Sequence, residues 1–232
     1  MTADDRLLSA TGPFEGSAAA ALCEAFVKVP GVGIALVSGK GEILYENEEI
    51  RKMYLDAPQG GFVGRRIPEL FPPDWAQERL RLLQRVVSTG QGLALREVWR
   101  GRQILATMRP IPSEGGEDPV VLIISRPTEG SDPLSTLDGF EVVESAFVEL
   151  GDLSALTPRE LVVLSLLGQG LTLKEIAATL HRSFKTVDNH RSAIGRKLNQ
   201  TDRLMLARLA AQAGLRVDDA HLERVKFKPP ST

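Results

Sequence analysis

Apolar and polar positions follow a helical period in the last third of the chain, most regularly between Ser183 and Leu198. Val187, Ile194 and Leu198 recur at helical spacing and form one apolar stripe. A second stripe is polar and consists of Lys185, Asp188, Asn189, Ser192 and Arg196. A helix with this pattern packs its apolar side on a core and presents its polar side to water or to a partner.

Signals for helix ends surround this stretch and predict a compact helical unit. Thr157 and Thr172 each open a capping box with a glutamate three residues later, and Ser183 can cap the next helix. Gly170 fits the left-handed position after the first helix. About three residues separate the second and third helices, which is the spacing of a helix-turn-helix.

A fourth helix is predicted from Thr201 or Asp202 to Ala213, closed by Gly214. Its apolar residues cover more than one face of the helix. One face can pack on the helical unit itself, and the surplus predicts a surface for a second copy of the chain. The residues predicted for dimerisation are Met205, Leu206, Leu209 and Ala213.

The side chains on the polar stripe suit a double-stranded DNA partner. Asparagine, aspartate and serine can hydrogen-bond base edges in the major groove. The surrounding arginines and lysines can neutralise phosphates. A helix that is apolar on one side, and polar with basic flanks on the other, therefore predicts a DNA-reading element.

Motifs spread over residues 156–215 resemble the LuxR-type (GerE-like) DNA-binding domain. They are Leu156–Leu161, Gly170, Lys174–Ala177, Lys185–Val187, Asn189–His190 and Arg196–Leu198. In that family the third helix enters the major groove and the fourth commonly contributes to dimerisation. The resemblance therefore implies an all-α, four-helix reading domain.

The polar stripe and the resemblance together assign two classes of DNA contact. The residues expected to face bases are Lys185, Asp188, Asn189 and Ser192. Those expected to contact the backbone are Lys174, Ser183, Thr186, His190, Arg191, Arg196 and Lys197. Structural roles compete at some positions: His190 can be a hydrogen-bonded structural histidine, and Arg196 and Lys197 can complement the helix dipole. Two residues depart from the family pattern, Gly195 and the acidic Asp188.

The first half of the chain follows a different pattern, with short strands interrupted by helices. Asn47 is expected to cap a short helix that begins at Glu48. Longer helices are predicted over 17–29 and 75–88, and strands over 32–38, 42–45, 93–99, 103–110 and 119–126. This order predicts an α+β domain with an antiparallel sheet and flanking helices.

The same order resembles a PAS domain over Pro30–Pro127. The residues that carry the resemblance are Gly33–Val37, Gly41–Asn47, Phe62–Arg65, Glu69–Pro72 and Arg109–Ile111. Such domains sense small molecules, light or redox state, or only mediate dimerisation. The resemblance therefore implies a sensory or dimerisation domain.

The positions of histidine and cysteine restrict the cofactors of this domain. His181, His190 and His221 lie outside Pro30–Pro127, which argues against a haem held by a domain histidine. The single cysteine, Cys23, lies in the preceding helix and outside the context of a flavin adduct, and it is expected to be a packing residue. No cofactor is identifiable, and the domain is expected to hold an unknown small apolar ligand or none.

The segment between the two halves allows two interpretations. Pro127–Pro133 has the composition of a linker. Phe140, Val143, Phe147 and Leu150 follow at steps of three, four and three, the spacing of a signalling helix that pairs across a dimer. Alternatively, this segment packs on one of the domains or forms a strand. Residues 227–232 are expected to be disordered.

Charge divides the chain in the same way as the motifs. Residues 1–155 carry a net charge of −8, residues 156–215 carry +5, and the tail carries +1. A basic unit joined to an acidic one is typical of a DNA-binding protein with a separate non-DNA domain. We expect an N-terminal extension (1–29), a PAS-like domain (30–127), a connecting segment (128–155), a helix-turn-helix domain (156–215) and a tail (216–232).

These observations predict a homodimeric, sequence-specific transcription regulator. No Walker loop, zinc-spaced cluster or nucleophile elbow occurs, so an enzyme is not expected. No apolar run approaches the length of a membrane span and the first residues are acidic, so a cytoplasmic protein without a membrane partner is expected. The alternative is an interaction protein that docks on RNA polymerase or another regulator, with weak DNA binding of its own.

Overall fold

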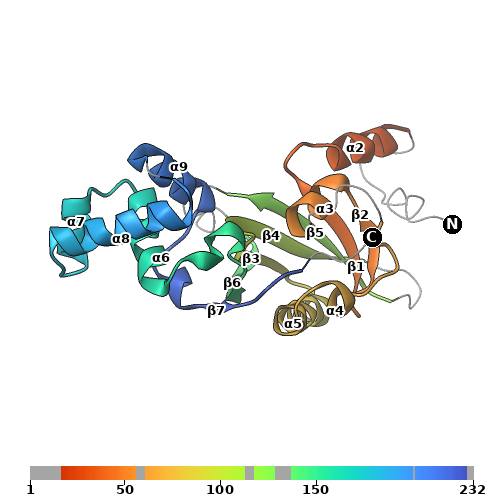
Figure 1. The fold of residues 1–232 in the computed structure, drawn as a ribbon. Helices are drawn as coiled ribbons and strands as arrows, with labels where there is room; N and C mark the ends of the chain where they lie inside the picture. The colour runs from red at the N-terminus through yellow and green to blue at the C-terminus, as the bar shows by residue number, and fades with distance from the viewer. Residues whose placement is uncertain (1–16, 56–60, 113–117, 129–136, 201, 229–232) are drawn as a thin grey trace.

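A computed structural model describes residues 17–55, 61–112, 118–128, 137–200 and 202–228. Parts of three expectations lie outside these residues: the N-terminal extension before 17, the linker from 129 to 133, and the disordered tail from 229 to 232. The described chain forms a seven-stranded sheet joined at one end to a helical unit (Figure 1).

The sheet has the order β2-β1-β5-β4-β3-β6-β7. Its first five strands pair antiparallel, as a PAS fold requires, while β6 pairs parallel to β3 and β7 parallel to β6. The strands are β1 (Gly33–Ser38), β2 (Ile43–Glu46), β3 (Gly92–Trp99), β4 (Arg102–Ile111), β5 (Val120–Pro127), β6 (Phe140–Val148) and β7 (Glu223–Arg224).

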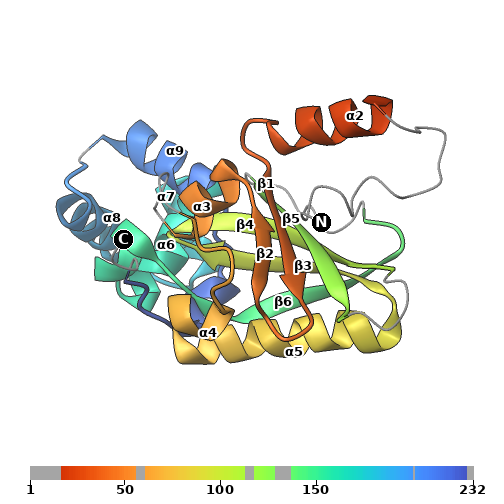
Figure 2. The same cartoon turned by 90° about the vertical axis from the view of Figure 1, so that its right-hand side faces the viewer.

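In this half of the chain the described residues form four helices: α2 (Ser17–Val27), α3 (Glu48–Tyr54), α4 (Ile67–Leu70) and α5 (Pro73–Thr89). Asn47 caps α3 as predicted, since its side chain accepts from the Ile50 amide at 3.0 Å. The long α5 ends at Gly90, also as predicted, and lies along one face of the sheet (Figure 2). Together α3, α4, α5 and the sheet enclose the first hydrophobic core.

The predicted dimer helix around Phe140–Leu150 is wrong, and the alternative of a strand is correct. Residues Phe140–Val148 form β6, which pairs with β3 from Gly92 to Val98. Phe147 and Val143 pack on the first core, and Val148 packs on the second. Backbone pairing with β3 and burial on both sides outweigh the helical spacing of the apolar residues.

The helical unit contains α6 (Pro158–Gly168), α7 (Leu173–Thr179), α8 (Phe184–Lys197) and α9 (Arg203–Ala213), with 3-10 turns η2 (Gly151–Ala155) before and η3 (Asp218–His221) after. Both predicted capping boxes are present, at Thr157 and Thr172. Gly170 and Gly214 have positive φ, as their predicted C-terminal positions require. The helix-turn-helix is thus built from local signals.

The second hydrophobic core takes residues from both halves of the chain. Besides α6–α9 it includes Val98 of β3, Val148 of β6, Leu150 and Leu153 before α6, and Ala220 after α9. The helical unit is therefore packed directly on the sheet rather than tethered to it.

Part of the predicted disordered tail is ordered by packing. Phe227 lies against the first core, and its neighbour Val225 does the same. Apolar packing and the pairing of β7 hold this part of the tail. The prediction of disorder considered only its place near the end of the sequence and took no account of these contacts.

Candidate nucleic-acid interface and an internal cavity

The predicted reading helix, α8, is anchored on one side and exposed on the other. The Ser183 side chain caps it by accepting from the Thr186 amide at 3.1 Å. Val187 and Ile194 are fully buried in the second core. α7 and α8 lie at the end of the molecule away from α5 (Figure 1), so the sheet leaves this surface accessible.

The polar stripe of α8 faces outward. Lys185, Asn189, Ser192 and Arg196 are exposed, as are Ser183 and, on α7, Lys174. Asp188, Thr186, His190 and Arg191 are half-buried at the edges of the stripe. The structure therefore leaves four members of the polar stripe of α8 accessible, whereas Lys197 has a partner within the protein. Which of them touch bases stays a prediction.

Asp188 has a cationic partner on its own helix. Arg191 Nε lies 3.0 Å from the Asp188 carboxylate, and Arg191 Nη2 lies 3.2 Å from Ser192 Oγ. The arginine therefore offsets the acid that departs from the family pattern. Asp188 also competes with DNA phosphates for Arg191, which was expected to contact the DNA backbone.

Lys197 is exposed, but its amino group pairs with a buried carboxylate. Its Nζ lies 2.6 Å from Glu160 Oε2, the same oxygen that accepts from the Thr157 amide at 2.7 Å. Burial raises the pKa of Glu160, but the hydrogen bonds from Lys197 and Thr157 outweigh burial and hold that pKa below its ordinary value. In this arrangement Lys197 locks the end of α8 to the start of α6, and this contact competes with phosphate binding.

The predicted dimerisation face of α9 is only partly available. Leu206 and Ala213 are buried in the second core, so this part of the prediction is wrong for the chain as folded here. The second core therefore covers part of the apolar surface that was predicted to contact a second copy. Leu209 is half-buried, Met205 is 43% exposed, and the neighbouring Leu204 is 76% exposed.

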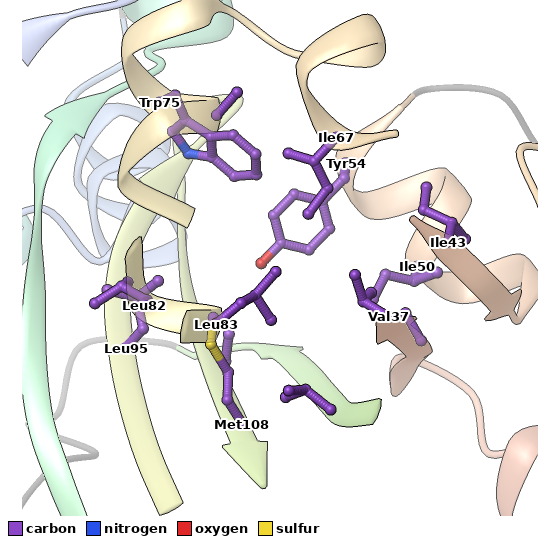
Figure 3. Packing of buried hydrophobic residues seen from close by; sticks show 14 of the residues in the cluster. Val37, Ile43, Ile50, Tyr54, Ile67, Trp75, Leu82, Leu83, Leu95 and Met108 are labelled. Carbon is purple, nitrogen blue, oxygen red and sulfur yellow. The ribbon is translucent and has the colours of Figure 1, made fainter. Parts of the chain in front are cut away.

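An internal cavity of about 80 Å³ lies in the first core, between α5 and the sheet. Figure 3 shows Tyr54 near the middle of this cluster, among Ile67, Trp75 and Leu83. Most of the cavity wall is aliphatic or aromatic, and the polar members of the lining are Glu46, Tyr54, Arg79, Glu97 and Ser125. The space holds several waters or one small molecule.

The polar side of the cavity is organised by Glu97, which is buried on β3. Its carboxylate accepts from Tyr54 Oη at 2.7 Å, from Trp75 Nε1 at 3.0 Å and from the Arg79 guanidinium. Ser125 Oγ lies 3.3 Å from Tyr54 Oη. Burial and the adjacent Glu97 raise the pKa of Tyr54 well above its ordinary value, so Tyr54 keeps its proton as a donor.

This cluster was missed in the sequence, although β3 contains a signal for it. Leu95, Glu97 and Trp99 alternate along the strand and share one face. A charged residue between two large apolar ones on an inward face requires a buried partner.

A second residue that the sequence analysis did not single out is Phe184. It lies at the start of α8 and is 50% exposed.

Comparison with known proteins agrees with this division of the chain. Residues 154–210 match the GerE family, the bacterial regulatory proteins of the luxR family, and residues 30–130 match the PAS fold. The chain thus carries a LuxR-type helix-turn-helix domain and a PAS domain.

Curated relatives match over part of the chain. The virulence-factor positive transcription regulator BvgA of Bordetella pertussis is 36% identical over 83 residues, and so is BvgA of Bordetella bronchiseptica. The match covers 36% of this chain and 40% of each relative's length.

Two similar solved structures are of VqmA from Vibrio cholerae. The VqmA–ligand–DNA complex is 19% identical, covers 84% of this chain and 88% of that chain, and has a TM-score of 0.48. The VqmA dimer in the absence of target DNA is 20% identical over 82% of this chain and 86% of that chain, with a TM-score of 0.43.

Among the residues that the structure describes here, no helix is long and apolar enough to cross a membrane.

Proposed function

We propose that this chain, which joins a PAS fold to a LuxR-type helix-turn-helix domain, is a sequence-specific DNA-binding transcription regulator that responds to a small molecule. The observation that carries the proposal is α8. Its apolar side is anchored in a core, its polar side is exposed, and it belongs to a stretch with a net charge of +5. Such a helix can enter the major groove without unfolding its own domain.

Two classes of side chain on α8 have distinct roles in this proposal. Asn189 is exposed at the centre of the stripe, where an amide can pair with adenine. Arg196 is exposed near the C-terminal end, where a long cation can reach a phosphate. The chain acts as a homodimer that places two such helices on successive half-sites. The exposed Leu204 and Met205 are the part of α9 that remains available for the partner.

The experiment compares Asn189→Ala and Arg196→Ala in the full-length chain, on duplexes selected from a random pool, at two salt concentrations. Asn189→Ala should lose about 1–3 kcal/mol of binding free energy on the preferred duplex and should relax the sequence preference at one base pair. Arg196→Ala should weaken binding to all duplexes alike. It should also reduce the slope of log affinity against log salt concentration by about one unit.

Gln212→Ala is the matched control, because Gln212 is exposed on α9 rather than on α8. It should bind as the unsubstituted protein does. If no duplex is enriched, while the protein binds RNA polymerase, the chain is an interaction protein instead. If Asn189→Ala weakens every duplex equally, the assignment of the polar stripe to base reading is wrong.

The cavity restricts the signal to a small molecule, mainly apolar, with a group that can hydrogen-bond to Tyr54 or Ser125. A multiply charged ligand would not fit the mostly apolar wall of this cavity. Native mass spectrometry of the purified chain should show a bound fraction of low excess mass that disappears on denaturation. A cavity that remains empty in protein purified from its own host would refute the sensing half of the proposal.

A further inference from the structure

The chain returns to the sheet after α9, the last helix of the helix-turn-helix domain (156–215), which is called the reading half below. Glu223 and Arg224 form β7, which pairs in parallel with the end of β6. The Val225 amide then donates to the Val148 carbonyl at 3.0 Å. In Figure 1 this segment leaves the helical end of the molecule and runs along the sheet toward α4 and α5. The tail therefore joins the two halves a second time.

The end of this tail lies in the aromatic cluster beside the cavity. The ring of Phe227 stacks on Phe71, with centroids 5.8 Å apart and planes 25° apart, and lies 5.2 Å from Trp99. Phe71 lines the cavity and lies 4.6 Å from Trp75, another lining residue. Phe227 is thus one ring removed from the cavity and forms the outer layer of its wall.

The other end of the tail is fixed to the reading half. The Arg224 guanidinium donates to the Leu156 carbonyl, just before α6, at 2.9 Å. Further upstream, Asp219 accepts two hydrogen bonds from Arg96 of β3, at 2.8 and 2.7 Å. A displacement of Phe227 therefore acts on the start of α6 over a few residues of paired backbone.

We propose that residues 222–228 are a coupling strap, through which the contents of the cavity set the position of the helix-turn-helix. The proposal rests on the function proposed above and adds its route of regulation. A ligand that fills the cavity contacts Phe71, and a close-packed wall of low compressibility transmits that contact to the Phe227 ring behind it. Coupling between two sites is reciprocal, so DNA bound at α8 changes the affinity of the cavity for its ligand. If the strap carries this coupling, DNA binding also alters the packing of the aromatic cluster.

The two tryptophans of the chain make this reciprocal effect measurable. Trp75 and Trp99 both belong to the cluster, and the reading half contains none. A fluorescein-labelled duplex, selected from a random pool, is titrated with the full-length protein to give binding by anisotropy. The unlabelled duplex is then titrated into the protein while tryptophan emission is recorded.

We expect tryptophan emission of the unsubstituted protein to change with the same midpoint as anisotropy. In Phe227→Ala the duplex should still bind and the emission response should be lost. Phe227→Leu, which keeps apolar volume without the ring, should retain part of the response. Lys226→Ala is the control, because Lys226 lies in the same tail with an exposed side chain, and it should respond as the unsubstituted protein does.

Three outcomes would overturn the strap. An unchanged response in Phe227→Ala would show that coupling takes another route, such as Arg96 and Asp219. Binding without any emission change in the unsubstituted protein would show that the two halves are uncoupled, although DNA binding would stand. No anisotropy change at all would refute DNA binding itself, and with it the regulatory role of the strap.

Discussion

Arg96→Ala is expected to lower the free energy of unfolding by about 3–5 kcal/mol, since removing one member of a buried ion pair strands the other. Arg96 is 1% exposed and Asp219 is 3% exposed. Arg96 also donates to Gln103 at 2.6 Å and to the Gly214 carbonyl at 3.3 Å. The substitution would therefore leave a buried carboxylate and two further acceptors without this donor.

Urea unfolding at pH 7 measures this loss. Arg102→Ala is the matched control, because Arg102 is an exposed arginine on the adjacent strand. It should change stability by less than about 0.5 kcal/mol. The double substitution Arg96→Leu with Asp219→Leu should recover much of the loss, because replacing both charges leaves neither unpaired. A loss in Arg96→Ala no larger than that of the control would mean that the pair does not hold the two halves together.

Glu97→Ala is expected to lower the free energy of unfolding by a similar amount, about 3–5 kcal/mol, through damage to the first core. The change would leave Arg79 buried without its partner on β3, and would remove the acceptor of Tyr54 Oη and Trp75 Nε1. Glu97→Gln keeps an acceptor and should lose less. Because Trp75 donates directly to this carboxylate, its emission should shift in both variants.

Thermal and urea unfolding of the two variants, beside Glu69→Ala, provide the comparison. Glu69 forms an exposed pair with Arg65, whose loss should cost less than about 1 kcal/mol. The prediction fails if Glu97→Ala is as stable as Glu69→Ala. Glu97 and Arg96 are neighbours on one strand but serve opposite faces, so their substitutions should damage different cores.

Much of the reading half was predictable because its signals are local. Thr157, Thr172 and Ser183 each cap a helix within three residues of themselves, and the stripe of α8 repeats within one helix. These features depend on backbone geometry that neighbouring residues determine. The exposed polar surface of α8 followed from them directly.

The contacts between the halves were not predictable in this way. Arg96 and Asp219 are 123 residues apart, and a pair at that separation leaves no local pattern. The same limitation explains the error on β6: the spacing of Phe140, Val143 and Phe147 fits a helix, while its parallel pairing with β3 depends on a distant strand. The surplus apolar surface of α9 was likewise assigned to a second copy, although Leu206 and Ala213 pack in the second core, which also takes Val98 and Val148 from distant strands.

The pairing of β7 with β6 has a consequence for how the protein is made. A ribosome releases the N-terminal half first, and domains generally fold as they emerge. Here one edge strand of the sheet, β7, and the ring of Phe227 are translated only after the helix-turn-helix. The aromatic layer around Phe71 and Trp99 therefore remains incomplete during synthesis until residues 223–227 have left the ribosome.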